Sequence, residues 1–247
     1  MNLEELTGID CVFVGCAAFR DGAEVPEVLD FLAQREGEII HADTREEYLD
    51  PLQCVREDPD GDLFRGYGVS FRQRALQPEV YDYVHAAEGG YDPLSRPGAG
   101  ALSYYRDSRT LTLHQNTDFP DPVQERATKI ERVGIGLLQF IYHFAPLLRP
   151  AYAYIDAIDA DTGAFPNESF RETGEVTFLC WANYFGPAIV AKVGEGFLLE
   201  APGWQRVKLP CGGVLYVVTQ GFLGWHFGKH RSHVQYFRQK FPDIEEL

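Results

Sequence analysis

Hydrophobic and polar positions along the chain follow two spacings, one typical of strands and one of helices. The clearest alternation, over residues 67–74, places Tyr67, Val69 and Phe71 on one face, which predicts a strand with one face in water. Apolar runs predict further strands over residues 11–19, 38–42 and 151–156. Paired runs at 103–106 with 110–114, and at 204–209 with 214–219, flank turn segments and predict two hairpins.

A helical stripe predicts one long helix after residue 121. Asp121 is the expected N-cap, Pro122 the first helical residue and Gln124 the partner that closes the cap, while Pro146 and Pro150 are expected to end the helix. The apolar positions at helical spacing are Ala127, Ile130, Leu137, Leu138, Ile141 and Phe144. Shorter helices are predicted over residues 26–34, near 44–51 and over 231–241.

The most apolar punctuated run, residues 175–187, is expected at the centre of the fold. Its bulky side chains are too closely spaced to alternate, which predicts a strand buried on both faces. Gly186-Pro187 stops that strand, and Pro187 is suited to the first turn of a short helix over 187–193. Gly194 is expected to take a left-handed conformation just past the helix end.

Strands that pair mostly by hairpins and alternate irregularly with helices predict an α+β fold. We expect a largely antiparallel sheet with one long helix and several short helices packed on it. Residues 1–247 are expected to form a single domain, in which the segment 77–100, rich in proline and glycine, is an insertion or mobile segment.

Charge and cysteine usage then restrict the classes of function. The 37 acidic and 22 basic residues give a net charge of −15, which repels nucleic acid and anionic membranes and speeds encounter with a cationic partner. Five scattered cysteines without a C-x-x-C pair indicate reduced thiols. The acidic N-terminus lacks signal-peptide features, and the apolar stretch 133–148 is too short to span a bilayer, so we expect a cytoplasmic protein with no membrane partner.

Two acidic turns invite a test for metal binding. Asp58, Asp60 and Asp62 have the spacing of a calcium loop, but Leu63 and Val69 stand where the loop needs glycine and glutamate. In the turn at 156–163, Asp159 and Asp161 offer two ligands, but Phe170 takes the place of the glutamate. Both are interpreted as solvated turns, and no metal is predicted there.

The densest set of zinc-type ligands is His226, His230 and His233. No H-E-x-x-H, G-x-S-x-G, P-loop or dinucleotide-binding motif accompanies it, and the apolar surroundings of Cys180 indicate an inert thiol. We therefore predict no catalytic residue, no cofactor and no enzyme. The alternative hypothesis is a metal-assisted hydrolase that uses the three histidines with an aspartate from the turn at 156–161.

Three segments together resemble a known family. They are Trp181-Ala-Asn-Tyr-Phe-Gly-Pro-Ala-Ile-Val-Ala-Lys-Val-Gly194, Leu199-Glu-Ala-Pro-Gly-Trp204 and Gly212-Gly-Val-Leu-Tyr216. They are similar to bacterial immunity proteins of polymorphic-toxin and type VI secretion systems, which have an aromatic strand ending in Gly-Pro, a short helix, an Ala-Pro turn and a Gly-Gly hairpin. The resemblance covers about residues 181–220.

This resemblance implies a cytoplasmic antidote that binds one cognate effector toxin and has no catalysis of its own. Many such toxins are nucleases with basic clefts, which an acidic inhibitor can occupy. The acidic turns and one tryptophan at the end of the second hairpin are the expected partner contacts: Asp58, Asp60, Asp62, Asp156, Asp159, Asp161 and Trp225.

Overall fold

The computed structural model describes residues 12–18, 38–42, 68–72, 100–105, 110–116, 122–158, 170–226, 228 and 230–245. The predicted helices over 26–34 and near 44–51 lie outside these residues. So do the acidic turn at 58–62 and all of the segment 77–100 except Gly100. The prediction that residues 1–247 form a single domain stays a prediction.

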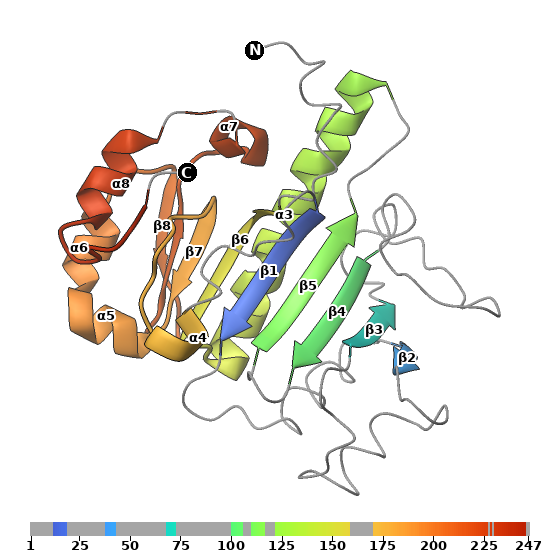
Figure 1. The fold of residues 1–247 in the computed structure, drawn as a ribbon, viewed down its shortest axis with the longest axis horizontal. Helices are drawn as coiled ribbons and strands as arrows, with labels where there is room; N and C mark the ends of the chain where they lie inside the picture. Colours follow the sequence, from blue (N-terminus) through green and yellow to red (C-terminus); the bar gives the residue numbers. More distant parts are fainter. Residues whose placement is uncertain are drawn as a thin grey trace, which may run out of the picture.

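One antiparallel sheet runs through the described residues (Figure 1). Its order is β2-β3-β4-β5-β1-β6-β7-β9-β8, and every neighbouring pair is antiparallel. The strands are β1 (Val12–Ala18), β2 (Glu38–Ala42), β3 (Gly68–Arg72), β4 (Gly100–Tyr105), β5 (Thr110–Asn116), β6 (Tyr152–Ile158), β7 (Ala182–Phe185), β8 (Gln205–Lys208) and β9 (Val214–Val217). The hairpins β4–β5 and β8–β9 confirm the two hairpin predictions.

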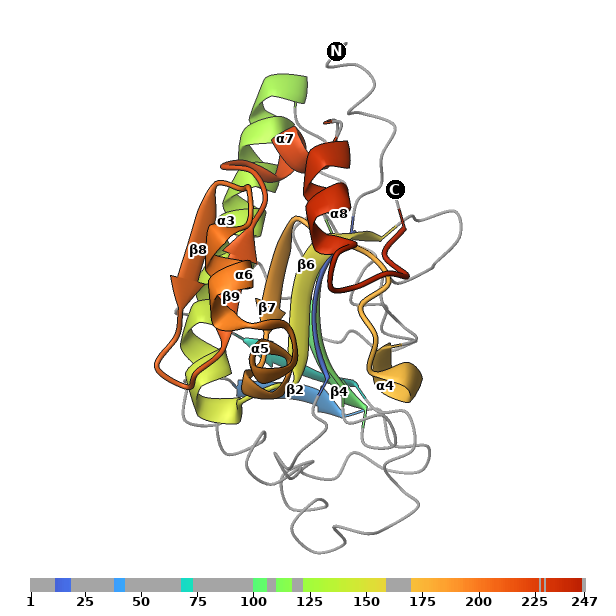
Figure 2. The same cartoon turned by 90° about the vertical axis from the view of Figure 1, so that its left-hand side faces the viewer.

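The helices lie on both sides of this sheet. Figure 2 shows α3 (Val123–Leu148) on one side and α4 (Phe170–Thr173) and α8 (Arg231–Phe237) on the other. Three further short helices are α5 (Pro187–Val193), α6 (Glu195–Glu200) and α7 (Phe222–His226). The predicted α+β fold, with a largely antiparallel sheet, one long helix and several short ones, is confirmed.

The register of the strands decides which side chains meet which helices. Tyr152 pairs with Phe185, and directly opposed residues share a face of the sheet. That face meets α4 and α8, because Phe170 lies 5.0 Å from Tyr152 and Phe237 lies 5.8 Å from Phe185 between ring centroids. A layer of aromatic rings therefore fills the space beneath these two helices.

The long helix α3 was predicted correctly in its stripe but not at its ends. Ala127, Ile130, Leu137, Leu138 and Ile141 are buried, as the helical spacing required. At its start Pro122 is the N-cap residue rather than the first helical residue, and its carbonyl oxygen accepts hydrogen bonds from the following turn. At its end Pro146 lies inside the last turn, and the helix stops at Leu148 because Arg149 adopts a left-handed φ of 47°.

The central run forms a shorter strand than predicted. Only Ala182–Phe185 is strand, although all four residues are buried, which confirms the expectation for its two faces. Helix α5 agrees with the sequence. Gly194 has the expected positive φ of 99°, but its ψ of 128° is not that of a left-handed helical residue. Helices α4, α6 and α7 were missed. Gly186 is required by a close approach, since a Cβ there would lie 2.4 Å from the Pro150 carbonyl oxygen.

No described helix is both long enough and apolar enough to cross a membrane.

Candidate functional site

A buried carboxylate lies where the end of β6 meets α7. Asp156 is 4% exposed, and the indole nitrogen of Trp225 donates to its two oxygens at 3.2 and 3.1 Å. The backbone N–H of Trp181 donates to Oδ2 at 3.3 Å, and that of Ala157 donates to Oδ1 at 2.9 Å. We call Asp156, Trp181 and Trp225 the Asp156 cluster.

Among the described residues, the groups shown to donate to this carboxylate are all neutral. Burial raises the pKa of Asp156 from 3.8 to about 6, although hydrogen bonds from Ala157, Trp225, Cys180 and Trp181 act in the opposite direction. The cause is desolvation, which disfavours the ionised form more than these neutral donors stabilise it. Asp156 therefore binds its proton at a higher pH than an exposed aspartate does.

A second buried polar group sits beside the cluster on β7. The side-chain oxygen of Asn183 accepts from the Tyr152 hydroxyl at 2.8 Å and from the Cys180 backbone N–H at 3.1 Å. The amide nitrogen of Asn183 donates to the Cys180 carbonyl oxygen at 2.7 Å. Asn183 thus fixes the chain just before β7 and connects it to β6, which is a structural role.

His230 contacts Trp225, and His233 on α8 contacts His230. The ring of His230 stacks on that of Trp225 with centroids 4.4 Å apart, and His230 Nε2 donates to the Trp225 carbonyl oxygen at 2.9 Å. The ring of His233 lies 5.6 Å from that of His230. Burial, followed by the neighbouring His230, lowers the pKa of His233.

Helix α7 is held in place by a carboxylate from α3. Glu131 accepts the backbone N–H of Phe222 at 2.8 Å and that of Leu223 at 3.0 Å. These N–H groups belong to the first turn of α7, so Glu131 caps a helix that begins about ninety residues later. A Cβ at Gly221 would lie 2.6 Å from Glu131 Oε1, so a larger residue there would push the end of the Glu131 side chain out of its present position.

Two of the predicted partner contacts, Asp156 and Trp225, are buried in the structure. Asp156 and Trp225 were expected at a surface turn and at the exposed end of a hairpin, but they are 4% and 6% exposed and bond to each other. They are buried because β6 continues through Asp156 to Ile158 and α7 folds over its end. Asp58, Asp60, Asp62, Asp159 and Asp161 lie outside the described residues.

The histidine hypothesis receives no support from the described residues. His230 uses Nε2 for the Trp225 carbonyl oxygen, and the side chain of His226 is not among those described. Across the described part of the chain no three His, Cys, Asp or Glu side chains are grouped so that they could hold a metal ion.

Trp204 lies just before the hairpin β8–β9 and is exposed, in contrast to the buried Trp225, which lies after that hairpin. Trp204 is 47% exposed and directly precedes β8, which ends the sheet order. Arg206 and Lys208 are also exposed on β8, and Lys208 Nζ lies 2.7 Å from Glu195 on α6. We call Trp204, Arg206 and Lys208 the β8 edge. Trp204 was not among the predicted contacts. The signal that could have found it is a tryptophan directly before the first strand of the hairpin.

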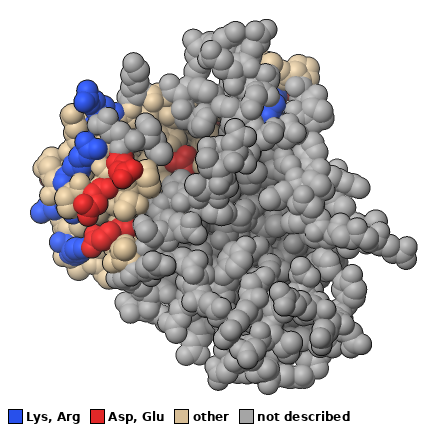
Figure 3. All heavy atoms as spheres, viewed as in Figure 1, with Lys and Arg blue, Asp and Glu red and all other residues tan. Residues whose placement is uncertain are grey.

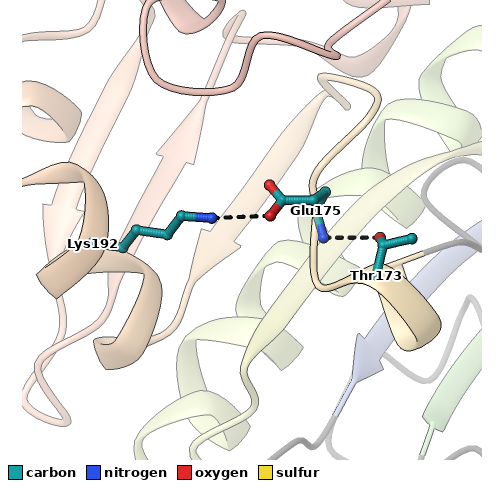
Figure 4. Close-up of polar contacts among 3 residues, drawn as sticks. All are labelled: Thr173, Glu175 and Lys192. Atoms are coloured by element: carbon teal, nitrogen blue, oxygen red, sulfur yellow. Dashed lines mark hydrogen bonds and ion pairs between the residues drawn. The ribbon is translucent and has the colours of Figure 1, made fainter.

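Exposed charges surround this end of the molecule. Figure 3 shows Lys and Arg side chains along the outer margin of the described part, beside a band of Asp and Glu. One exposed pair joins two elements: Lys192 Nζ on α5 lies 3.0 Å from Glu175 Oε1, while the Glu175 backbone N–H donates to Thr173 Oγ1 (Figure 4). Such a pair contributes little to stability because both partners are largely in water.

The protein that contains the Asp156 cluster and the β8 edge has an α+β fold, and its described strands form one antiparallel sheet. No protein-family model matches the chain, and no curated protein matches it. Among solved structures it is similar to the Pseudomonas aeruginosa T6SS protein PA0821, with a TM-score of 0.47 and 12% identity over 96% of this chain and 73% of that one.

Proposed function

We propose that this chain is an immunity protein, which binds a cognate secreted effector toxin and neutralises it by protein–protein contact. The observation that carries the proposal is the resemblance of residues 181–220 to such immunity proteins. In the fold that run is one continuous unit: β7, α5, α6, β8 and β9, with the β8 edge on its outside.

The state of the buried polar groups favours binding over catalysis. Both oxygens of Asp156 accept from groups of the chain itself, and so does the side-chain oxygen of Asn183. A general base or nucleophile has to reach a substrate, and these groups are enclosed. Trp204, in contrast, offers an aromatic surface of the kind that anchors protein partners.

Charge is divided unevenly along the chain in a way that suits a protein partner. Residues 1–120 contain 23 acidic and 10 basic residues, whereas residues 121–247 contain 14 and 12. The first part therefore supplies nearly all of the negative charge and would accelerate association with a basic toxin surface, such as the cleft of a nuclease. Asp58, Asp60 and Asp62 remain our proposed contacts there.

The proposal is tested with the secreted toxin encoded beside this gene. Co-expression of the chain should restore growth to cells that make the toxin in their cytoplasm, and the two proteins should co-purify. Reversing the charge of Asp58, Asp60 and Asp62 to lysine should slow association and flatten its dependence on salt. A toxin that remains active and unbound in the presence of the wild-type chain contradicts the proposal.

A further inference from the structure

Within the described part of the chain, the backbone of β8 has N–H and C=O groups that no neighbouring strand uses. Leu209 N–H donates to the Gly213 carbonyl oxygen at 2.8 Å, and Gly212, with a φ of 89°, donates to the Leu209 carbonyl oxygen at 2.9 Å. Leu209 and Gly213 are thus a hydrogen-bonded pair at the turn, and such pairs alternate with non-bonded ones along an antiparallel ladder.

This alternation fixes the direction of each peptide group in β8. The next hydrogen-bonded pairs are Val207 with Leu215 and Gln205 with Val217. The backbone N–H and C=O groups of Arg206 and Lys208 therefore point away from β9, toward the open side of the strand. Among the described strands none lies beyond β8, and Figure 2 draws it at the end of the sheet.

The side chains on this strand discriminate between two kinds of occupant. If a second copy paired antiparallel through its own β8, centred on Val207, then Arg206 of one copy would stand opposite Lys208 of the other. Like charges directly opposite each other destabilise a strand pair, and charged edge residues are a known safeguard against self-association. An extended segment with acidic side chains would instead place carboxylates opposite these cations.

The charge of the surrounding chain points in the same direction. Residues 187–245 contain seven basic residues, Lys192, Arg206, Lys208, Lys229, Arg231, Arg238 and Lys240, against the four acidic residues Glu195, Glu200, Asp243 and Glu245. Counted along the sequence, this part of an otherwise acidic protein carries three more basic than acidic residues, although Lys192 and Lys208 already form ion pairs with Glu175 and Glu195. Trp204 adds a large apolar side chain directly before the open strand.

We propose that the β8 edge is the docking site for an extended, acidic segment of the toxin, which adds to the sheet as a further antiparallel or parallel strand. The inference rests on the proposed function and names the surface through which the chain would bind the toxin. Main-chain hydrogen bonds to Arg206 and Lys208 would provide affinity, while Trp204 and the two cations would provide selectivity.

Hydrogen exchange on the wild-type chain, free and bound to catalytically inactivated toxin, tests this directly. In the free chain the amides of Arg206 and Lys208 should exchange faster than that of Val207, which is bonded to β9. In the complex both should become protected. Protection that appears only elsewhere in the chain overturns the inference.

Proline substitution separates the backbone contact from the side chain. Lys208→Pro removes an outward N–H that β9 does not use, so the hairpin should keep its pairing. It should weaken toxin binding about tenfold, as expected for one lost hydrogen bond, whereas the matched Lys208→Ala should weaken it less. Circular dichroism and urea unfolding of both variants verify that the fold is kept.

Side-chain variants test the chemistry of the partner segment. Trp204→Ala should weaken binding about 30-fold if the indole is an anchor. Arg206→Glu should weaken it more than Arg206→Gln, because only the former repels an acidic segment; tighter binding by Arg206→Glu overturns the acidic assignment. If the wild-type chain does not bind the toxin at all, the proposed function fails and this inference with it. If it binds and all β8 variants bind equally well, only this inference fails.

Discussion

The two tryptophans that flank the second hairpin have opposite environments. Trp225 is enclosed between β6 and α8, donates to a carboxylate and stacks on a histidine. Trp204 is about half exposed to solvent at the end of the sheet. The same residue type therefore holds elements together after the hairpin and remains accessible before it. Stability and binding should therefore respond to different substitutions.

The largest loss of stability is expected from Trp225→Ala. The substitution empties a buried indole site and removes the side-chain donor from Asp156, so the free energy of unfolding should fall by about 3–5 kcal/mol. Urea unfolding measures the change. A loss below about 1 kcal/mol would show that Trp225 is not a packing residue, and the contrast with Trp204 would disappear.

The pH dependence of stability should follow Asp156. Its pKa is about 6 in the folded chain and 3.8 in the unfolded chain, so between these values the folded chain keeps a proton that the unfolded chain has lost. The free energy of unfolding should therefore fall as pH rises from about 4 to 6, by about 3 kcal/mol from this group, and then level off. Asp156→Asn serves as the reference: the difference between wild type and variant, from urea unfolding at each pH, should carry this slope. A flat difference contradicts the assignment.

A smaller effect is expected at the cap of α7. Glu131→Ala leaves the N–H groups of Phe222 and Leu223 without their acceptor, which should cost about 1–2 kcal/mol. Glu131→Gln keeps one acceptor oxygen and should recover part of the loss. Hydrogen exchange at residues 222–225 should increase in the alanine variant before the sheet is affected; unchanged exchange there would count against the cap.

The smallest effect on stability is expected from Trp204→Ala. Because the side chain is half in water, the free energy of unfolding should change by no more than about 0.5 kcal/mol. The urea midpoint of this variant, measured beside that of Trp225→Ala, gives the comparison its clearest form. A loss similar to that of Trp225→Ala would mean that Trp204 supports the fold and is not reserved for a partner.

The sequence predicted local elements well wherever periodicity and turn residues agreed. The hairpins, the stripe of α3 and the Gly186-Pro187 stop with α5 behind it were all visible, because each depends on residues close together in the chain. Helix α7 was missed, since its capping residue is Glu131 on a different helix and its own five residues carry no stripe.

The position of Asp156 could not be inferred locally either. The run of aspartates from 156 to 161 has the composition of a solvated turn, and composition favours exposure. What buries Asp156 is Trp225, 69 residues later, together with the N–H of Trp181. Likewise, the open side of β8 follows from the strand order, which hairpin patterns alone do not determine.

The placement of β1 has a consequence for how the chain is made. This strand is the first of the described strands, but its two neighbours in the sheet are β5 and β6, and β6 ends at Ile158. A ribosome adding about 5–20 residues per second would need roughly 7–28 s after making β1 before its second neighbour exists. During that time an apolar strand has no completed sheet to join, so the newly made chain should depend on chaperones more than a protein built only from successive hairpins.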